Sequence, residues 1–139
     1  MMNITRRNAL ALGLGGLAVA ALPLPARAAV EDAVAAFTGG AAPGTGGITL
    51  TAPEIAENGN TVPVAVDAPG AVSIIVLAAG NPEPEVATFT FGPAAGSQMA
   101  STRIRLAQTQ DVIAIAKMPD GSFVQAQSTV KVTIGGCGG

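Results

Sequence analysis

The chain has 139 residues with one cysteine and no histidine, tryptophan or tyrosine. Its nine acidic and seven basic residues give a net charge of −2, and three of the basic residues lie in the first 28 positions, so the remainder carries −5. This acidic balance argues against nucleic acid or an anionic membrane as a partner. Without histidine there is no Ser-His or Cys-His catalytic pair, and a single cysteine cannot assemble a usual zinc or haem site. We interpret the scattered carboxylates as surface and turn charges, and we expect no catalytic group, metal or cofactor on the chain itself.

The first 28 residues have the pattern of an export signal. A basic start with Arg6 and Arg7 precedes an apolar run over residues 9–22, and small residues form a cleavage pattern that ends at Ala28. The run is shorter than the roughly 20 residues that span a bilayer. The paired arginines indicate a twin-arginine signal, with Ala9 where that motif usually has phenylalanine, and an ordinary secretory signal is the alternative. We therefore expect residues 1–28 to be removed and the mature chain to lie in the periplasm.

Residues 29–47 are predicted to form a short helix and a linker. Four apolar residues recur at helical spacing: Val30, Ala33, Val34 and Phe37. Glu31 and Asp32 would lie in the first turn of this helix, where the dipole favours acidic side chains. The segment 39–47, GGAAPGTGG, ends the helix and is too rich in glycine and proline to hold regular structure. The helix would therefore be able to dock separately, on this domain or on a partner.

Residues 48–134 contain strand patterns separated by turn signals. We expect about seven strands, at residues 48–51, 61–67, 71–78, 86–91, 101–106, 111–117 and 123–134. The run Ile74–Leu77 is continuously apolar, which suits a strand covered on both faces, whereas Pro63 suggests an edge strand or a bulge. The number and spacing of the strands predict an all-β, immunoglobulin-like β-sandwich as a single domain.

Finer features of the strand pattern predict which side chains face inward. Alternation along residues 101–106 places Ile104 and Leu106 inward, with Arg103 and Arg105 outward. The segment MPDGS at 118–122 predicts a tight hairpin turn in which glycine takes a positive φ. The segment ENGN at 57–60 predicts another turn.

The chain ends in GGCGG, residues 135–139, directly after the last predicted strand. The four glycines of this flexible carrier arm are Gly135, Gly136, Gly138 and Gly139. Glycine combines free backbone rotation with almost no bulk, so the arm could enter a cleft of another protein. From Ile134 to Cys137 it would span at most about 10 Å. An unpaired cysteine in an exported protein invites intermolecular pairing or free-thiol chemistry, and we interpret Cys137 as a covalent attachment point on which partner enzymes act.

Other interpretations of the tail stay open. The domain could be a periplasmic binding or scaffold module whose tail is passive, or whose cysteine forms a covalent dimer. A terminal Gly-Gly converted to a thiocarboxylate would need ATP, which an exported protein does not meet, and would leave Cys137 unexplained. A copper chaperone is more remote, because Met99 and Met118 are not clustered with the cysteine.

Four features together resemble the SoxY family: the twin-arginine signal, AAFTGG at 35–40, PEIAENGNTVPV at 53–64 and GGCGG at 135–139. The resemblance covers essentially the whole mature chain. It implies an immunoglobulin-like sandwich that forms a heterodimer with a SoxZ-like subunit. It also implies that the chain is a carrier without catalytic activity, and that Cys137 bears the sulfur intermediates of thiosulfate oxidation.

The partners implied by this resemblance are enzymes of the periplasmic sulfur-oxidising pathway. A haem enzyme would join thiosulfate oxidatively to the sulfur of Cys137. A dimanganese hydrolase would then release the terminal sulfonate as sulfate, and a sulfane dehydrogenase or a sulfur-removing step would process what remains. The chain itself would need no cofactor.

Overall fold

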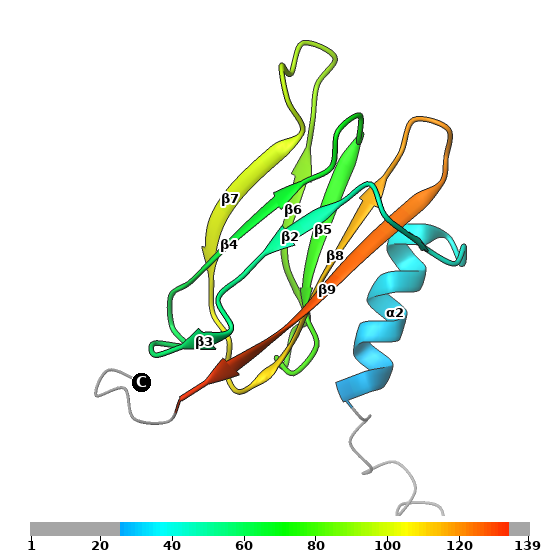
Figure 1. The fold of residues 1–139 in the computed structure, drawn as a ribbon. Helices are drawn as coiled ribbons and strands as arrows, with labels where there is room; N and C mark the ends of the chain where they lie inside the picture. The colour runs from blue at the N-terminus through cyan, green and yellow to red at the C-terminus, as the bar shows by residue number, and fades with distance from the viewer. Residues whose placement is uncertain (1–25, 134–139) are drawn as a thin grey trace, which may run out of the picture.

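The computed structural model describes residues 26–133, and residues 1–25 and 134–139 lie outside the described part. This part contains one helix and nine strands, packed as a β-sandwich with the helix on one side (Figure 1). The elements are α2 (Ala26–Thr38), β1 (Gly44–Thr45), β2 (Thr49–Thr51), β3 (Ile55–Ala56), β4 (Val62–Asp67), β5 (Ser73–Ala78), β6 (Glu85–Thr90), β7 (Met99–Ile104), β8 (Gln110–Lys117) and β9 (Phe123–Val132). The predicted immunoglobulin-like β-sandwich is confirmed.

The strands form a six-stranded and a three-stranded sheet. The larger sheet has the order β1-β9-β8-β5-β6, with β3 also pairing with β9, and the smaller sheet has the order β2-β4-β7. Neighbouring strands are antiparallel except β1 and β3, which run parallel to β9. The longest ladder joins β8 to β9, from Lys117 opposite Phe123 to Gln110 opposite Val130. The C-terminal strand therefore lies inside the larger sheet, with partners on both edges.

The main core lies between the two sheets and follows the alternation of the strands. From β4 the inward residues are Val62, Val64 and Val66, and from β5 they include Ile74 and Val76, all of them buried. Beyond the end of β7, Leu106 also reaches this core. The predicted inward positions of Ile104 and Leu106 are confirmed, and so are the exposed positions of Arg103 and Arg105.

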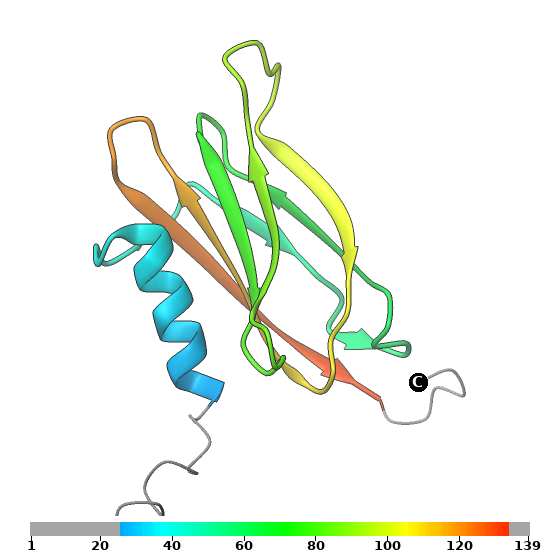
Figure 2. The ribbon, with the colours of Figure 1, turned by 180° about the vertical axis from the view of Figure 1, so that it is seen from behind.

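A second, smaller core lies on the outer face of the larger sheet, where α2 packs (Figure 2). The sheet contributes Ile75, Leu77 and Ile115, and the helix contributes Phe37 with Ala33 and Val34. The rings of Phe37 and Phe123 meet edge to face, with 5.7 Å between centroids and 66° between planes. Strand β5 is thus covered on both faces, as its continuous apolar run predicts, and the predicted apolar face of the helix docks on its own domain.

Glycines at two turns have the positive φ that their positions require. Gly39 and Gly40 end α2 with φ of 66° and 92°. In the turn between β8 and β9, Gly121 has φ of 86°, and its amide donates to the carbonyl of Met118 at 3.0 Å. The end of the helix at these two glycines and the positive φ of Gly121 agree with the predictions from the sequence.

Three expectations about local structure are wrong. The helix α2 begins at Ala26, so Glu31 and Asp32 lie beyond its first turn. The segment 39–47, expected to lack regular structure, contains β1, because Gly44 and Thr45 pair with Val124 and Gln125 of β9. Strand β4, expected at an edge or with a bulge because of Pro63, lies between β2 and β7, and its register with both neighbours is continuous.

The position of Pro63 explains how a central strand accommodates proline. Strand β2 pairs only with the last three residues of β4, from Ala65 to Asp67. Pro63 therefore has a partner on the β7 side, Arg103, but none on the β2 side. Since proline lacks an amide hydrogen, it fits where one edge of the strand is locally open.

Candidate functional site

The residues predicted to carry the function lie outside the described part of the chain. This applies to Cys137, to the arm glycines Gly135, Gly136, Gly138 and Gly139, and to Arg6 and Arg7 of the export signal. The structure does describe Thr133, which follows β9 and leads directly into this C-terminal segment. We call the three segments that meet here, residues 54–60, 105–109 and 131–133, the arm root.

Strand β3 holds one edge of the arm root. Ile55 and Ala56 run parallel to Lys131 and Val132 of β9. The amide of Lys131 donates to the carbonyl of Glu54 at 2.9 Å, and the amide of Thr133 donates to the carbonyl of Ala56 at 3.1 Å. Backbone pairing on this side therefore continues to the last described residue.

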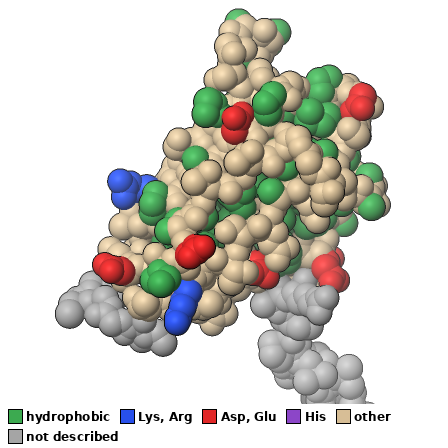
Figure 3. Space-filling view, viewed as in Figure 1, with side chains coloured by type: hydrophobic (Ala, Val, Ile, Leu, Met, Phe, Trp, Pro, Cys, Tyr) green, Lys and Arg blue, Asp and Glu red, His purple; other side chains and the backbone are tan. Residues whose placement is uncertain are grey.

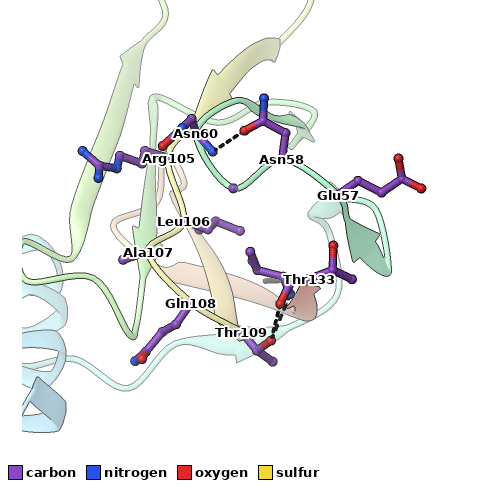
Figure 4. Close-up of a pocket in the computed structure, with 11 residues that line it drawn as sticks. Glu57, Asn58, Asn60, Arg105, Leu106, Ala107, Gln108, Thr109 and Thr133 are labelled. Carbon is purple, nitrogen blue, oxygen red and sulfur yellow. Dashed lines mark hydrogen bonds between the residues drawn. The ribbon is translucent and has the colours of Figure 1, made fainter. Parts of the chain in front are cut away.

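On the edge of β9 that faces β8, a side chain provides the hydrogen bonds at the position just before β8 begins. The first residue of β8, Gln110, lies opposite Val130, so β8 supplies no backbone partner for Val132. Instead, the amide of Val132 donates to Oγ1 of Thr109 at 2.9 Å, and the same hydroxyl donates to the carbonyl of Val132 at 3.3 Å. Figure 4 shows these bonds beside the pocket. The threonine side chain extends the ladder by one residue pair.

A pocket of about 630 Å³ lies at the arm root, between the turn at 57–60 and the loop at 105–109 (Figure 4). Its lining residues are Glu57, Asn58, Gly59, Asn60, Arg105, Leu106, Ala107, Gln108, Thr109, Val132 and Thr133. The side chains of Glu57 and Arg105 point outward on opposite sides of this region. The pocket therefore offers mainly amide, hydroxyl and apolar groups.

Gly59 brings the three segments of the arm root together. Its carbonyl accepts a hydrogen bond from the amide of Leu106 at 2.7 Å. A Cβ atom at this position would lie 2.5 Å from the carbonyl oxygen of Leu106 and 3.0 Å from Cγ1 of Val132. Only glycine allows the backbone to approach this closely.

Hydrogen bonds from the buried Gln110 and the half-buried Asn81 hold the loop at 105–109 in place. Gln110, only 7% exposed, accepts a hydrogen bond from the amide of Gly80 at 2.8 Å and donates to Oδ1 of Asn81 at 2.9 Å. Asn81 in turn donates to the carbonyl of Arg105 at 2.7 Å and accepts from the amide of Ala107 at 2.9 Å. These hydrogen bonds act together with Leu106, which is buried in the main core, to hold the loop in place.

Chain connectivity limits where the thiol can be. Cys137 is four residues beyond Thr133, so their Cα atoms lie at most about 14 Å apart. Cys137 must therefore lie close to the arm root.

Charge at the described surface is dispersed. Acidic side chains are spread over the face shown in Figure 3, and no group of three or more potential metal ligands occurs among residues 26–133. The pKa of Asp120 is lowered, first by the hydroxyl of Ser122 and then by the Ser122 amide, in the turn at the start of β9. No helix in the described part is long and apolar enough to cross a membrane.

Sequence reasoning missed the residues that build the arm root. ENGN at 57–60 was predicted as a turn, and the hydrogen bond from Thr61 to Asn58 confirms it, but the close packing of Gly59 was not foreseen. Thr109, Asn81 and Gln110 carry no motif. For Gln110, the one available signal is a polar residue at the start of an apolar strand.

These features define a class of protein: a small immunoglobulin-like β-sandwich whose last strand is anchored on both edges and leads into a tail with a single cysteine. The family model described as sulfur oxidation protein SoxY matches residues 34–137, so the match extends to Cys137. The chain belongs to the SoxY family.

Solved structures agree with this assignment. The sulfur carrier protein SoxY from Chlorobium limicola f thiosulfatophilum is 37% identical, with a TM-score of 0.65, over 77% of this chain and 98% of that chain. A superoxide reductase (neelaredoxin) from Ignicoccus hospitalis is 18% identical, with a TM-score of 0.56, over 65% of this chain and 81% of that chain, which shows likeness of fold alone. No curated protein gave a match.

Proposed function

We propose that this chain is a sulfur carrier that holds intermediates of thiosulfate oxidation covalently on Cys137 and presents them to partner enzymes. The observation that carries the proposal is the family match, which runs through the sandwich and ends at the single cysteine. The similarity to a solved sulfur carrier protein supports the same role. The anchored end of β9 provides a firm base for a short tail, and this arrangement suits a carrier.

The chemistry at Cys137 can be written with balanced atoms and electrons. Loading joins the thiol to thiosulfate with loss of one proton and two electrons, giving Cys–S–S–SO3⁻, and the electrons pass to a haem-containing partner. Hydrolysis of the terminal sulfonate in a dimanganese partner then consumes one water and leaves sulfate, two protons and Cys–S–S⁻. A sulfane dehydrogenase would then oxidise the remaining outer sulfur to give Cys–S–SO3⁻, which consumes three waters and releases six protons and six electrons, and the electrons pass to a redox-active acceptor protein. In each step the chain supplies only the sulfur atom to which the cargo is bonded.

The short tail limits how far from the sandwich a partner enzyme can reach the cargo on Cys137. Because Cys137 lies within about 14 Å of Thr133, a partner must bring its reacting groups close to the arm root. Glycines on both sides of the cysteine keep the tail narrow enough for a cleft. Ordering them costs conformational entropy, which weakens docking and favours release to the next enzyme.

Intact-mass spectrometry tests the carrier role. Protein isolated from cells grown on thiosulfate should show sulfur and sulfonate adducts that a reductant removes, and Cys137→Ser protein from the same cells should show none. The substitution should also abolish thiosulfate oxidation while leaving the fold unchanged by circular dichroism. If the wild type carries no adduct and Cys137→Ser supports normal oxidation, the alternative of a scaffold module with a passive tail is correct.

We further propose that the chain acts in the periplasm as a heterodimer with a SoxZ-like subunit. The paired arginines support export by the twin-arginine route, and the predicted cleavage after Ala28 lies inside α2, ahead of Ala33, Val34 and Phe37, which dock on the sheet. The mature helix would keep its contacts. Replacing Arg6 and Arg7 by lysine should leave full-length precursor in the cytoplasm, whereas replacing Arg103 and Arg105 in the same way should not.

A further inference from the structure

We propose that Thr109 is a positioning residue that fixes the point at which the C-terminal arm leaves the body of the protein. This inference rests on the proposed carrier role of Cys137, but the contacts that support it lie entirely among described residues. They are the two hydrogen bonds between the Thr109 hydroxyl and the backbone of Val132.

Thr109 stands at the place where β9 would otherwise lose one of its two neighbours. The backbone ladder between β8 and β9 stops at Gln110 and Val130. Beyond it, β9 keeps β3 on one edge, a strand of only two residues. Without the Thr109 hydroxyl, Val132 would be paired on that short strand alone, and an end held on one edge frays more readily than an end held on two.

The bonding pattern requires a hydroxyl group. Oγ1 of Thr109 accepts from the amide of Val132 and donates to the carbonyl of the same residue. A hydroxyl can do both, because it carries one hydrogen and two lone pairs. Valine has nearly the same shape and can do neither, whereas serine retains both bonds.

The loop that carries Thr109 is itself held in place. Asn81 bonds to Arg105 and Ala107 of this loop, and buried Gln110 bonds to Asn81. Gln110 also accepts from the amide of Gly80. Thr109 is therefore attached to a constrained backbone and does not simply follow the movement of β9.

The position of the last anchored residue sets the upper limit on the distance of Cys137 from the body of the protein. With the anchor at Thr133, four residues lead to the thiol, whereas an anchor at Val130 would leave seven and extend the reach from about 14 Å to about 25 Å. Effective concentration at a partner site falls with roughly the three-halves power of tether length, so this change costs about twofold. The anchor therefore bears on how efficiently a partner captures the cargo.

Hydrogen exchange and spin labelling test the anchor without thiosulfate or any partner enzyme. In full-length Thr109→Val, the Val132 amide should exchange about fivefold faster than in the wild type, since this amide loses its hydrogen-bond acceptor. A nitroxide placed on Cys137, the single cysteine of the chain, should report greater mobility. Thr109→Ser should restore both signals. Unchanged exchange and label mobility in Thr109→Val would overturn the inference.

A shorter arm tests whether the anchor at Thr109 affects the rate of thiosulfate oxidation. With partner enzymes below saturation, Thr109→Val should slow thiosulfate oxidation about twofold, and deleting Gly136 in that background should recover part of the loss. If deleting Gly136 slows thiosulfate oxidation by the same factor in Thr109→Val as in the wild type, Thr109 does not act through arm length and the inference is wrong. Absence of any adduct on wild-type Cys137 would refute the proposed function instead, while the exchange and label results would still decide whether Thr109 fixes the exit of the arm.

Discussion

Gly59 occupies a position where any side chain would collide with the backbone of Leu106 and with Val132. We predict that Gly59→Ala destabilises the protein by about 1–3 kcal/mol, because a methyl group would have to push the turn away from the loop or from β9. Thermal unfolding followed by circular dichroism measures the effect. Gly92→Ala is the matched control, since a Cβ at Gly92 meets nothing within 4 Å. Equal midpoints for the two variants would contradict the prediction.

The carboxylate of Asp120 forms another local interaction that can be tested singly. Its pKa lies below the usual 3.8 because the hydroxyl and then the amide of Ser122 donate to the ionised form. A lowered pKa in the folded state adds stability at pH above the unfolded value, and this stability is lost as pH falls through the folded value. We predict that Ser122→Ala raises the pKa of Asp120 and reduces the loss of stability below about pH 4. NMR titration of the carboxyl carbon reports the shift, and an unchanged titration curve would contradict the prediction.

At the scale of elements, α2 is held to the sheet by few side chains. Phe37 supplies the edge-to-face contact with Phe123 and packs against the second core. We predict that Phe37→Ala destabilises the protein by about 2 kcal/mol, through lost burial and the lost aromatic pair. Urea unfolding gives the change in free energy. The exposed Asp32 provides the control, and Asp32→Ala should change the free energy of unfolding by less than about 0.5 kcal/mol.

The elements that could be predicted from the sequence are those with a repeating apolar pattern. All seven expected strands are present, because alternation in β4 and the double coverage of β5 leave clear periodicity. The strands β1 and β3 were missed, since two residues carry no period. Their parallel pairing with β9 depends on where distant segments meet, and local pattern does not report this.

The candidate site was predicted in part. Cys137 stands out through its motif and its isolation, but Thr109, Gly59 and Asn81 act only through contacts with segments remote in sequence. A threonine or asparagine in a loop is ordinary by composition. Their roles became visible once the hydrogen bonds at 2.9 Å from Val132 to Thr109 and at 2.7 Å from Asn81 to Arg105 could be seen.

For the whole molecule, β9 determines whether the sandwich is complete. It contributes the fully buried Val130 and is the strand to which β1, β3 and β8 all attach. We predict that a chain ending at Thr133 folds with nearly the wild-type unfolding midpoint, whereas a chain ending at Thr129 loses the cooperative transition. Circular dichroism melts of the two truncated proteins test this. A cooperative melt from the shorter chain would show that the end of β9, from Val130 on, can be dispensed with.

The place of β9 in the sheet also has a consequence for biosynthesis. Strands β1, β3 and β8 leave the ribosome before β9, the one strand that joins them. Folding of this domain can therefore be completed only after β9 has left the exit tunnel. A nascent chain stalled with β9 inside the tunnel should be sensitive to protease, and a chain stalled after β9 has emerged should be resistant.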